Sequence, residues 1–572
     1  YPGSHDLNFS NRPVRTRMPG GVGGARSGIL TAPIPICSGQ RLNALAQSIP
    51  MQRETPHPQL HATAPGKLAW LVLFALIWAL YGLAGRDAWQ ADEAIALGAV
   101  LDWLERGNLP PHAPLYTWVA GLMARLLAGI YTLQEGARWA SGLFALAGVL
   151  FTGLAARSLY GTGYGAMAAL LLMGAFGLVL RVHALLPETA LLAGYALLLY
   201  GLAESRRGPD RAWAIFAGAF ALLLTRGLVD LLAALLCAAL PLALPGFPTR
   251  GYRLALVKAG IMLALAVIAW LAYLGSDGLL TDWWSGQVAR LAAYKGIARQ
   301  FNTLIWFAWP AWPLALAAIW HEHRRLAREN PLHLPLLATG ATLLAGLFAA
   351  YSHDGVAMPA LVPLTLLATF GIATIRRGAA QAFYWFGATC FAFFTLTFWL
   401  HYGALEWGWP ARLAAHLARM TPGYVPSVTA ADVGLAGAAT LVWLLAVPLF
   451  PRAQVRPALV WATGITLSWV LLIALLRPWA ELSWGYRPIA EAVEARLPVT
   501  ACLEIEGSGA ARVMMDYHLA RRLPAAGQLC GWRLQVGARE AQLRSGAELV
   551  WEGRRPREKR EVYRLYRLHD DG

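Results

Sequence analysis

The sequence predicts an all-α polytopic membrane domain followed by a small C-terminal α/β domain. Of the 572 residues, 57% are hydrophobic and only 14% are charged, and the mean hydropathy is +0.46. Apolar stretches at this density are typical of chains that cross a bilayer, and they exclude a soluble globular enzyme. The last 96 residues differ, because they carry 16 Lys and Arg and 13 Asp and Glu. This charge density predicts a soluble domain.

The net charge of +16 raises the question of nucleic acid binding. The basic residues lie in short clusters between apolar runs rather than on one face, as expected of loops next to anionic headgroups. The charge pattern therefore favours a membrane protein and no nucleic acid partner.

Residues 1–64 are predicted to form a disordered arm, because they are rich in Gly, Pro, Ser and Arg and lack hydrophobic periodicity. The arm has no apolar segment followed by a small-residue cleavage site, so we expect no cleaved signal peptide. Met51 is a candidate start, in which case residues 1–50 would not belong to the native protein. The membrane domain is predicted over residues 65–480 and the C-terminal domain over residues 481–572.

Thirteen apolar runs have about the length needed to cross a hydrocarbon core of roughly 30 Å. They cover residues 68–85, 139–156, 164–180, 189–203, 212–225, 229–244, 254–275, 304–320, 334–351, 356–375, 381–400, 431–450 and 457–476. A fourteenth candidate, residues 114–131, follows Pro110 and Pro111 and carries Arg125 among its apolar residues.

The basic residues decide how the fourteenth candidate is interpreted. If residues 114–131 lie at the interface, the loops on one side hold 13 Lys and Arg in 45 residues, and those on the other side hold 7 in 72. Short cytoplasmic loops collect Lys and Arg. If this segment spans instead, every later loop inverts and the basic loops face outward. The count therefore predicts thirteen spans in a bacterial inner membrane, with the N-terminus in the cytoplasm and the C-terminal domain in the periplasm.

This topology places residues 86–138 outside as one long loop with two membrane-parallel helices. Residues 92–106 place apolar and charged side chains with the period of an interfacial helix, and residues 114–131 form the second helix. Residues 282–299 predict a third, because they begin with Asp-Trp-Trp and continue with spaced basic residues.

Ionisable residues collect in these outer loops and at the outer ends of the spans. Such groups are costly at membrane depth and normally line a cavity or pathway, so a cluster on one side is a hypothesis for a site. The alternative for each residue is an ordinary solvated position in a loop. The candidates are Asp92, Glu93, His112, Arg181, His183, Glu188, Arg290, Lys295, His353 and Asp354.

Several segments resemble the bacterial GT-C glycosyltransferases, in particular the aminoarabinose transferase type, which is related to the protein O-mannosyltransferases. Three of them lie in or next to the first outer loop: Trp89-Gln90-Ala91-Asp92-Glu93, Ala113-Pro114-Leu115-Tyr116-Thr117-Trp118 and Gly136-Ala137-Arg138-Trp139-Ala140-Ser141-Gly142. Residues 181–188 and Ser352-His353-Asp354 resemble later motifs of the same family. The resemblance covers about residues 65–480 and implies thirteen spans, interfacial helices and a periplasmic C-terminal domain.

The resemblance also implies an activity and roles for the candidates. Members of the family move a sugar from a polyprenyl phosphate to a lipid or other cell-envelope acceptor, as in lipid A modification, and the transfer is inverting. Their aspartate in the first outer loop matches Asp92, with Glu93 beside it and Glu188 as a supporting acid. A carboxylate activates or orients the acceptor, and cations hold the departing phosphate. We expect substrate contacts from His112, Tyr116, Arg181, His183, Arg290, Lys295, His353 and Asp354.

Four positions depart from the aminoarabinose transferases. Ile95 and Ala96 stand where those enzymes carry Arg and Tyr, and Pro111 and His112 stand where they carry Glu and Lys. These differences remove a phosphate-binding lysine and an arginine. The resemblance therefore leaves the sugar and the acceptor open.

A metal and two other functional classes also stay open. The acidic candidates and the histidines could bind a divalent cation, although no close-spaced ligand motif such as HExxH occurs. A transporter or flippase would usually show internal repeats, which the sequence lacks. A non-catalytic membrane scaffold is favoured by the missing Lys and Arg, whereas the acidic pairs argue against it.

The C-terminal region predicts an α/β module with a disulfide. We expect helices at residues 487–497 and 511–522 and strands at residues 501–506, 528–536, 547–552 and 561–568. Cys502 and Cys530 lie at two of these strands, in a compartment that the predicted topology makes oxidising, so we expect them to pair. The alternative is two free thiols in neighbouring strands.

Overall fold

The structure is a computed structural model that describes residues 65–107, 110, 112–292, 297–326, 330–348, 355, 357–450, 453–507, 509–519, 530–538, 547–558 and 561–568. These residues belong to one compact unit. The predicted N-terminal arm lies outside the described residues.

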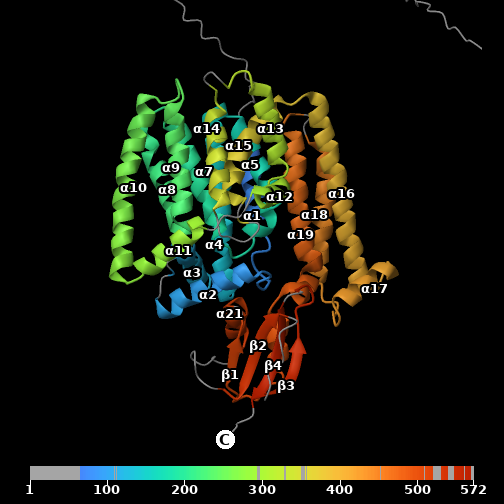
Figure 1. The fold of residues 1–572 in the computed structure, drawn as a ribbon. Coiled ribbons are helices and arrows are strands. Elements are labelled where there is room, and N and C mark those ends of the chain that lie inside the picture. Colours follow the sequence, from blue (N-terminus) through green and yellow to red (C-terminus); the bar gives the residue numbers. More distant parts are fainter. Residues whose placement is uncertain are drawn as a thin grey trace, which may run out of the picture. The chain divides into compact units, whose positions relative to one another are not determined.

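Most of the described chain is helical (Figure 1). The helices are α1 (Pro65–Leu80), α2 (Ala91–Arg106), α3 (Pro114–Leu126), α4 (Leu133–Tyr160), α5 (Tyr164–Met173), α6 (Leu178–Val182), α7 (Glu188–Glu204), η1 (Pro209–Arg211), α8 (Ala212–Arg226), α9 (Leu228–Ala239), η2 (Leu240–Ala243), α10 (Arg250–Ser276), α11 (Leu280–Ala292), α12 (Ile297–Phe307), α13 (Ala311–Glu322), α14 (His333–Leu347), α15 (Met358–Thr374), α16 (Arg377–Trp407), α17 (Ala411–Met420), α18 (Ala430–Leu449), α19 (Arg456–Trp484), α20 (Arg487–Glu494) and α21 (Gly509–His518). The strands are β1 (Leu503–Glu506), β2 (Trp532–Ala538), β3 (Ala547–Gly553) and β4 (Glu561–Leu568).

Several of these helices suit a membrane. Within the described residues, five are long and apolar enough to cross one, namely α4, α10, α16, α18 and α19. The number rises to six if the bent pair α12 and α13 is taken as one membrane span. The shorter apolar helices include α1, α14 and α15. The chain is therefore a multi-pass membrane protein, whereas the count of thirteen spans stays a prediction.

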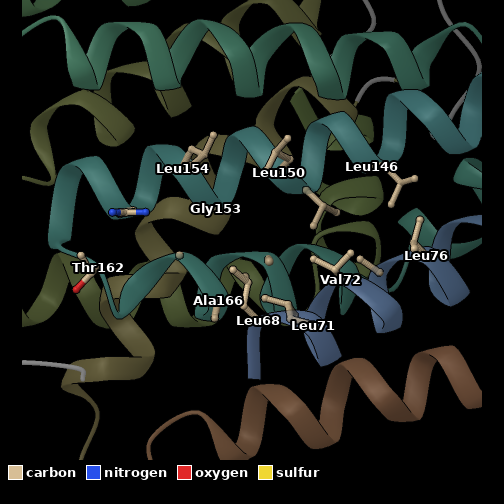
Figure 2. Close-up of a pocket in the computed structure, with 15 residues that line it drawn as sticks. Leu68, Leu71, Val72, Leu76, Leu146, Leu150, Gly153, Leu154, Thr162 and Ala166 are labelled. Atoms are coloured by element: carbon tan, nitrogen blue, oxygen red, sulfur yellow. The ribbon is translucent and has the colours of Figure 1, made fainter. Parts of the chain in front are cut away.

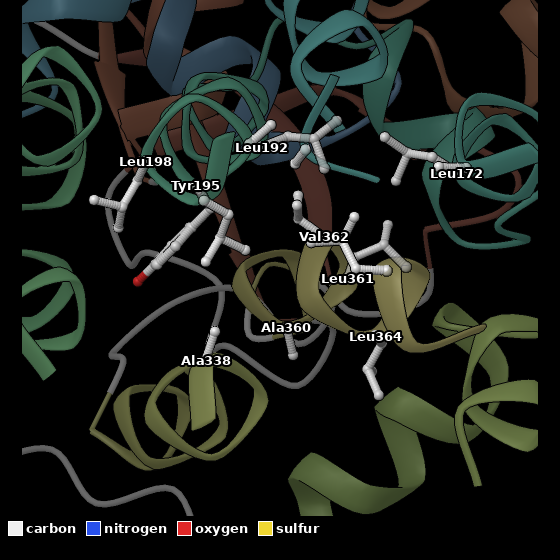
Figure 3. Packing of buried hydrophobic residues seen from close by; sticks show 14 of the residues in the cluster. Leu172, Leu192, Tyr195, Leu198, Ala338, Ala360, Leu361, Val362 and Leu364 are labelled. Atoms are coloured by element: carbon white, nitrogen blue, oxygen red, sulfur yellow. The ribbon is translucent and has the colours of Figure 1, made fainter. Parts of the chain in front are cut away.

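The core of the bundle is built from α5, α7, α13, α14 and α15, and α15 is buried along almost its whole length. Figure 3 shows Leu192 of α7 facing Leu361 and Val362 of α15. A Cβ atom at Gly371 would lie 1.9 Å from the carbonyl oxygen of Leu314, so α13 and α15 approach more closely than any larger residue allows. Small residues at such crossings are typical of helices packed inside a bilayer.

Two predicted spans are interrupted. The run at residues 164–180 breaks between α5 and α6, and the run at residues 304–320 breaks between α12 and α13, which meet at 96°. The two breaks supply hydrogen-bond partners to each other. The backbone N–H groups of Phe176 and Gly177 donate to the carbonyls of Trp309 and Phe307 at 2.9 and 3.0 Å. Backbone groups freed in an apolar medium need such partners, and this pairing explains why neither run is one continuous helix.

The helices predicted at the interface are present. In Figure 1, α2 and α11 lie across the end of the bundle rather than along it. Helix α3 has 13 residues, ends at Leu126 and packs on α2 and α4, so the segment at residues 114–131 is shorter than a span. The predicted helix at residues 282–299 is corrected: α11 ends at Ala292 and α12 begins at Ile297.

The C-terminal region forms the small α/β module that its sequence predicts. Its four-stranded sheet has the order β1-β2-β4-β3, with β1 parallel to β2 and the other pairs antiparallel. Leu534 and Leu565 from the sheet and Met514 and Met515 from α21 are buried in its core.

Helix α21 packs against α2, where a Cβ atom at Gly98 would lie 2.7 Å from a methyl group of Val513. Both helices lie at the same end of the bundle, as expected if the chain between them crosses the membrane an even number of times. Twelve crossings, the number between these helices in the predicted topology, satisfy this condition. The contact does not define which side faces the periplasm.

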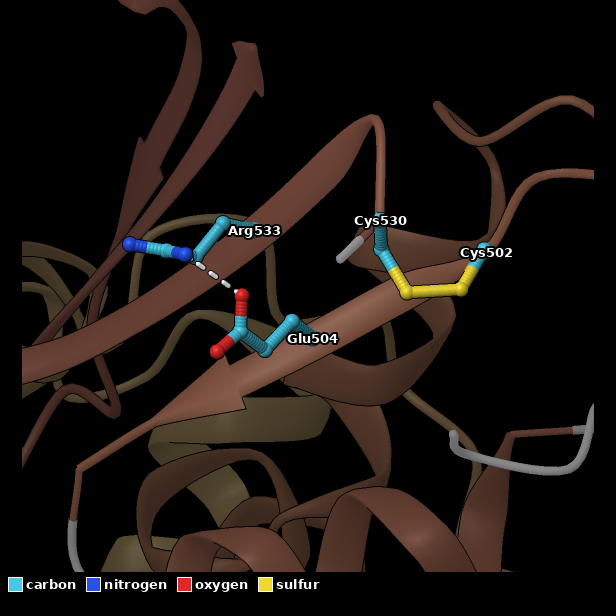
Figure 4. Close-up of a disulfide and its surroundings, with 4 residues drawn as sticks. All are labelled: Cys502, Glu504, Cys530 and Arg533. Atoms are coloured by element: carbon cyan, nitrogen blue, oxygen red, sulfur yellow. Dashed lines mark hydrogen bonds and ion pairs between the residues drawn. A yellow bond between two sulfur atoms is a disulfide. The ribbon is translucent and has the colours of Figure 1, made fainter. Parts of the chain in front are cut away.

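Cys502 and Cys530 form a disulfide with a Cα–Cα distance of 5.1 Å (Figure 4). The two cysteines precede the parallel neighbours β1 and β2, which brings their side chains to one edge of the sheet. On the same two strands, Glu504 lies opposite Arg533, whose Nε donates to its carboxylate at 2.9 Å.

The orientation of the protein can be tested with reporter fusions. Alkaline phosphatase fused after Gly572 is expected to be active, and the same reporter fused after Arg207 is expected to be inactive, because short basic loops stay in the cytoplasm. The fusion after Arg207 interrupts a loop at the end of α7, so its expression is checked with a cytoplasmic reporter at the same position. The opposite pattern of activity would invert the predicted topology.

The disulfide can be tested on the unreduced, alkylated protein. Mass spectrometry is expected to recover a linked peptide that contains Cys502 and Cys530, and reduction is expected to lower the free energy of unfolding of the domain by about 3 to 4 kcal/mol for a loop of this length. Recovery of both cysteines only as alkylated peptides would contradict the bridge and the oxidising compartment.

Candidate active site

A cavity of about 300 Å³ opens at the end of the bundle where α2, α3 and α11 lie. Its apolar walls include Ile95, Ala96 and Leu191. Its polar side chains come from five different segments of the chain, and they are Asp92, His112, Tyr116, Thr117, Glu188, Thr225, Arg226 and Arg290.

Asp92 lies in the first turn of α2, where a carboxylate is favoured by the partial positive charge of the helix N-terminus. Successive helical residues point about 100° apart, so Asp92 and Glu93 face different surroundings. Asp92 is half-buried and lines the cavity, whereas Glu93 is buried on the side of the protein interior.

Glu93 is held by four groups. Its carboxylate accepts from Arg86 at 3.0 and 3.2 Å and lies 3.5 Å from the Nε of Arg138. It also accepts from the backbone N–H groups of Trp89 and Leu185, each at 2.9 Å. Burial alone would raise the pKa of Glu93, but the two guanidinium groups and these donors hold that pKa below its usual range. Glu93 is therefore an ionised structural anchor and does not line the cavity.

Arg138 extends this anchor to the loop after α1. Its guanidinium donates to the carbonyls of Leu83, Arg86 and Asp87 at 2.8, 3.2 and 3.4 Å. The loop that leads into α2 is thus tied to α4, and the position of Asp92 follows from that attachment.

Asp87 ties the same loop to the C-terminal domain. Its carboxylate accepts from the backbone N–H groups of Tyr486 and Arg487 at 2.7 and 2.9 Å and from the Nε2 of His518 at 2.9 Å. Burial would raise the pKa of Asp87, but the hydrogen bond and charge of His518, together with the backbone donors, lower that pKa to about 2. The backbone N–H of Asp87 donates to Glu481 at 2.9 Å, so α19 joins the same junction.

Glu188 lies at the start of α7 and reaches the cavity. One carboxylate oxygen lies 3.5 Å from Arg181, and among the described residues the other oxygen has no hydrogen-bond partner. Arg181 donates to the side chain of Gln90 at 3.1 Å and is buried beside the cavity rather than in its wall. Arg181 therefore links Glu188 to the residue that precedes α2.

Two arginines that line the cavity come from the break between α8 and α9 and from α11. Arg226 is buried, donates to the carbonyl of Gly355 at 3.3 Å and lies 3.6 Å from Asp230, which accepts from Tyr195 at 2.6 Å. Arg290 donates to the carbonyl of Arg226 at 2.9 Å.

Gly227 makes this docking possible. Its φ of +87° suits glycine, and a Cβ atom there would lie 1.9 Å from the side-chain oxygen of Gln287. The same oxygen accepts from the backbone N–H of Leu228 at 3.0 Å. Helix α11 is thus fixed by its polar side chains to the break in the bundle.

His112 closes one side of the cavity, next to Gly286 and Arg290. Burial and the positive charge of Arg290 lower the pKa of His112, against a smaller opposite effect of Asp282. At neutral pH the imidazole is uncharged, so it can donate or accept a hydrogen bond but adds no positive charge.

Two predicted site residues direct their polar groups to partners other than the cavity. The hydroxyl of Tyr116 bonds to Ser141 at 2.6 Å, and burial raises the pKa of Tyr116, so only part of its ring faces the cavity. His183 is fully buried, bonds to the carbonyl of Trp78 at 2.7 Å and stacks on Trp469 with a centroid distance of 4.2 Å. The prediction that His183 contacts substrate is not supported by this position.

The structure therefore brings Asp92, His112, Tyr116, Glu188 and Arg290 into one cavity and places Glu93, Arg181 and His183 behind it. Lys295, His353 and Asp354 lie outside the described residues.

Sequence reasoning missed Arg226 and Thr225 as lining residues. A single arginine directly after the apolar run at residues 212–225, followed by Gly227, is the sequence signal that points to Arg226. Within the described chain, no group of three or more His, Cys, Asp or Glu side chains is arranged to hold a metal ion.

The bundle, the helices at its end and the C-terminal sheet together make a fold that is also found in a solved bacterial protein. The chain is similar to ArnT from Cupriavidus metallidurans bound to undecaprenyl phosphate, with a TM-score of 0.61 and 17% sequence identity, over 88% of this chain and 98% of that one. The apo state of the same protein matches with a TM-score of 0.61 and 16% identity, over 87% and 98% of the two chains. The likeness confirms the fold that the sequence motifs indicated.

A weaker likeness connects the chain with the oligosaccharyltransferase of Archaeoglobus fulgidus in its apo form, with a TM-score of 0.38 and 11% identity over 80% of this chain and 64% of that one. No family model and no curated protein sequence matches the chain.

The anchoring role of Glu93 can be tested by thermal unfolding in detergent. Glu93→Gln leaves two buried guanidinium groups without their carboxylate, so we expect the free energy of unfolding to fall by about 3 to 5 kcal/mol. The matched control is Glu105→Gln, an exposed position on the same helix, which is expected to change little. Equal melting temperatures for the two variants would disprove the anchor.

Proposed function

We propose that this protein is a membrane glycosyltransferase that moves a sugar from a polyprenyl-phosphate donor to a lipid or other cell-envelope acceptor on the periplasmic side of a bacterial inner membrane. The observation that carries the proposal is one cavity in which the carboxylates of Asp92 and Glu188 and the guanidinium groups of Arg226 and Arg290 come together at the end of an apolar bundle. The undecaprenyl phosphate bound to the similar ArnT structure supports a donor of this class.

The reaction is a single displacement that inverts the sugar. A hydroxyl oxygen of the acceptor forms a bond to the anomeric carbon while the bond from that carbon to the phosphate oxygen breaks. The bonding electrons leave with the polyprenyl phosphate, and the hydroxyl proton goes to Asp92. A phosphate acceptor has no proton to lose, and Asp92 then orients it.

Arg226 and Arg290 carry the positive charge that the departing phosphate needs. Arginine forms paired hydrogen bonds with phosphate oxygens, and the apolar walls of the cavity strengthen these interactions because they lower the local dielectric constant. The two arginines would replace the lysine and arginine that the sequence lacks relative to the aminoarabinose transferases. His112, uncharged at neutral pH, would contribute a hydrogen bond.

Glu188 supports the site from the opposite wall. One of its carboxylate oxygens has no hydrogen-bond partner within the described part of the chain and is suited to accept a hydrogen bond from a sugar hydroxyl, and Arg181 orients the other oxygen. Glu93 and His183 are assigned positioning roles, because neither lines the cavity. Lys295, His353 and Asp354 remain proposed substrate contacts.

The identity of the sugar is a separate question. Ile95 and Ala96 line the cavity as apolar residues where the aminoarabinose transferases carry polar ones. A site with this wall would bind a sugar with an apolar face at this position, which argues against aminoarabinose itself and against a direct role in lipid A modification by that sugar.

Asp92 can be tested by the release of polyprenyl phosphate from a labelled polyprenyl-phosphate sugar. The assay uses purified protein with a bacterial cell-envelope lipid extract as the source of acceptor. Asp92→Asn keeps the size of the side chain and removes its charge, so the rate is expected to fall by a factor of about 100 or more.

The control for this assay is Asp102→Asn, on the same helix but exposed and paired with Arg106 outside the cavity lining. It is expected to keep the rate within about twofold. Turnover by a well-folded Asp92→Asn variant at the rate of this control would remove Asp92 from the mechanism. Movement of labelled donor across proteoliposomes without release of polyprenyl phosphate would favour a flippase instead.

A further inference from the structure

An apolar groove lies on the membrane-facing side of α1, α4 and α5 (Figure 2). Its volume is about 610 Å³. One wall is a single face of α1, and the other is a single face of α4, since the lining residues recur at helical spacing. The lining residues are Leu68, Leu71, Val72, Ala75, Leu76, Leu146, Val149, Leu150, Gly153, Leu154, Arg157, Thr162, Gly165, Ala166 and Ala169.

The groove exists because the helices touch at two points and diverge between them. At one end α1 meets α4, where a Cβ atom at Gly142 would lie 3.2 Å from the carbonyl of Ala79. Helices α4 and α5 meet where a Cβ atom at Gly153 would lie 3.1 Å from the carbonyl of Gly165. The first half of α1 therefore stands away from the α4 and α5 pair, and Leu150 between them is 57% exposed.

Polar side chains lie at one end of the groove only. Figure 2 shows Thr162 at this end, beyond Leu154, and Arg157 also belongs to the lining. Among the described residues, the guanidinium of Arg157 has no hydrogen-bond or ion-pair partner, and the neighbouring carboxylate of Glu204 is engaged by Arg207 and Ser158. An uncompensated positive charge thus marks the mouth of an apolar groove.

The length of the groove matches one leaflet. A helix rises 1.5 Å per residue, so the wall from Leu146 to Arg157 covers about 16 Å, roughly half of a 30 Å hydrocarbon core. On the same scale Arg157 lies about 28 Å along α4 from Arg138, which belongs to the anchor behind the Asp92 cavity. The groove is therefore in the opposite leaflet from the candidate active site.

We propose that this groove binds one acyl chain of an anionic phospholipid from that leaflet, with the headgroup phosphate at Arg157 and Thr162. The apolar walls accept the chain, and the guanidinium and hydroxyl at the mouth are donors for phosphate oxygens. The basic loop that begins after α7 lies at the same end, as the hydrogen bond from Ser158 to Glu204 shows. This lipid site is independent of the proposed glycosyl transfer.

The test is native mass spectrometry of the full chain with added phosphatidylglycerol or phosphatidylcholine of identical acyl chains. The wild-type protein is expected to retain one phosphatidylglycerol in preference to phosphatidylcholine. Arg157→Gln is expected to weaken phosphatidylglycerol binding about five-fold and to leave phosphatidylcholine unchanged. Its control is Arg253→Gln, a basic residue of α10 outside the groove, which is expected to keep wild-type binding.

A second pair of variants tests the apolar part. Ala166→Phe fills the groove and is expected to weaken binding of both lipids, whereas Ala217→Phe on α8, outside the groove, is expected to have no effect. Equal retention of both lipids by the wild type and all four variants would reduce the groove to ordinary lipid-facing surface and overturn the proposal. Preference for polyprenyl phosphate over phosphatidylglycerol would also overturn it, because the occupant would then be the donor lipid.

Discussion

The structure depends on one buried carboxylate. Glu93 is enclosed by the guanidinium groups of Arg86 and Arg138, and these arginines in turn bind the backbone carbonyls of the loop after α1. Burying a charged group without partners would cost several kcal/mol of folding free energy. The carboxylate of Glu93 and its two arginines can therefore be buried only together. This requirement places the start of α2 against α4 and turns Asp92 toward the cavity.

The same loop also connects the membrane bundle to the C-terminal domain. Asp87 binds the N-terminal backbone of α20 and His518 of α21, while its own N–H group is bound by Glu481 at the end of α19. The C-terminal domain is therefore attached at the base of the candidate active site rather than at a remote linker. This attachment gives the domain a means to influence α2, since α21 packs directly against that helix.

Backbone hydrogen bonding explains where the bundle departs from straight helices. The breaks at residues 174–177 and 308–310 supply hydrogen-bond partners to each other. At the break at Gly227, Gln287 accepts from the freed backbone N–H, and the side chain just before the break, Arg226, lines the cavity. In an apolar medium an interrupted helix persists only when neighbouring groups bind the freed backbone. The break at Gly227 brings two arginines to the cavity. Arg226 lies directly before the break and lines the cavity, and the backbone at the break binds α11, the helix that carries Arg290.

The sequence by itself determined the class of fold, the positions of most of the apolar helices, the helices over residues 92–106 and 114–126 and the strands of the C-terminal sheet. These features follow from local hydrophobic periodicity and length, which a single segment carries in full. It also determined that Asp92, Glu188 and Arg290 are candidates, because charged residues next to apolar runs are rare. Only the tertiary structure decided which of them meet. Glu93 and Asp92 are neighbours in sequence but face different surroundings, and Arg226 joins the cavity from a helix break. Those outcomes depend on contacts between segments up to 431 residues apart, such as Asp87 with His518, which no local pattern encodes.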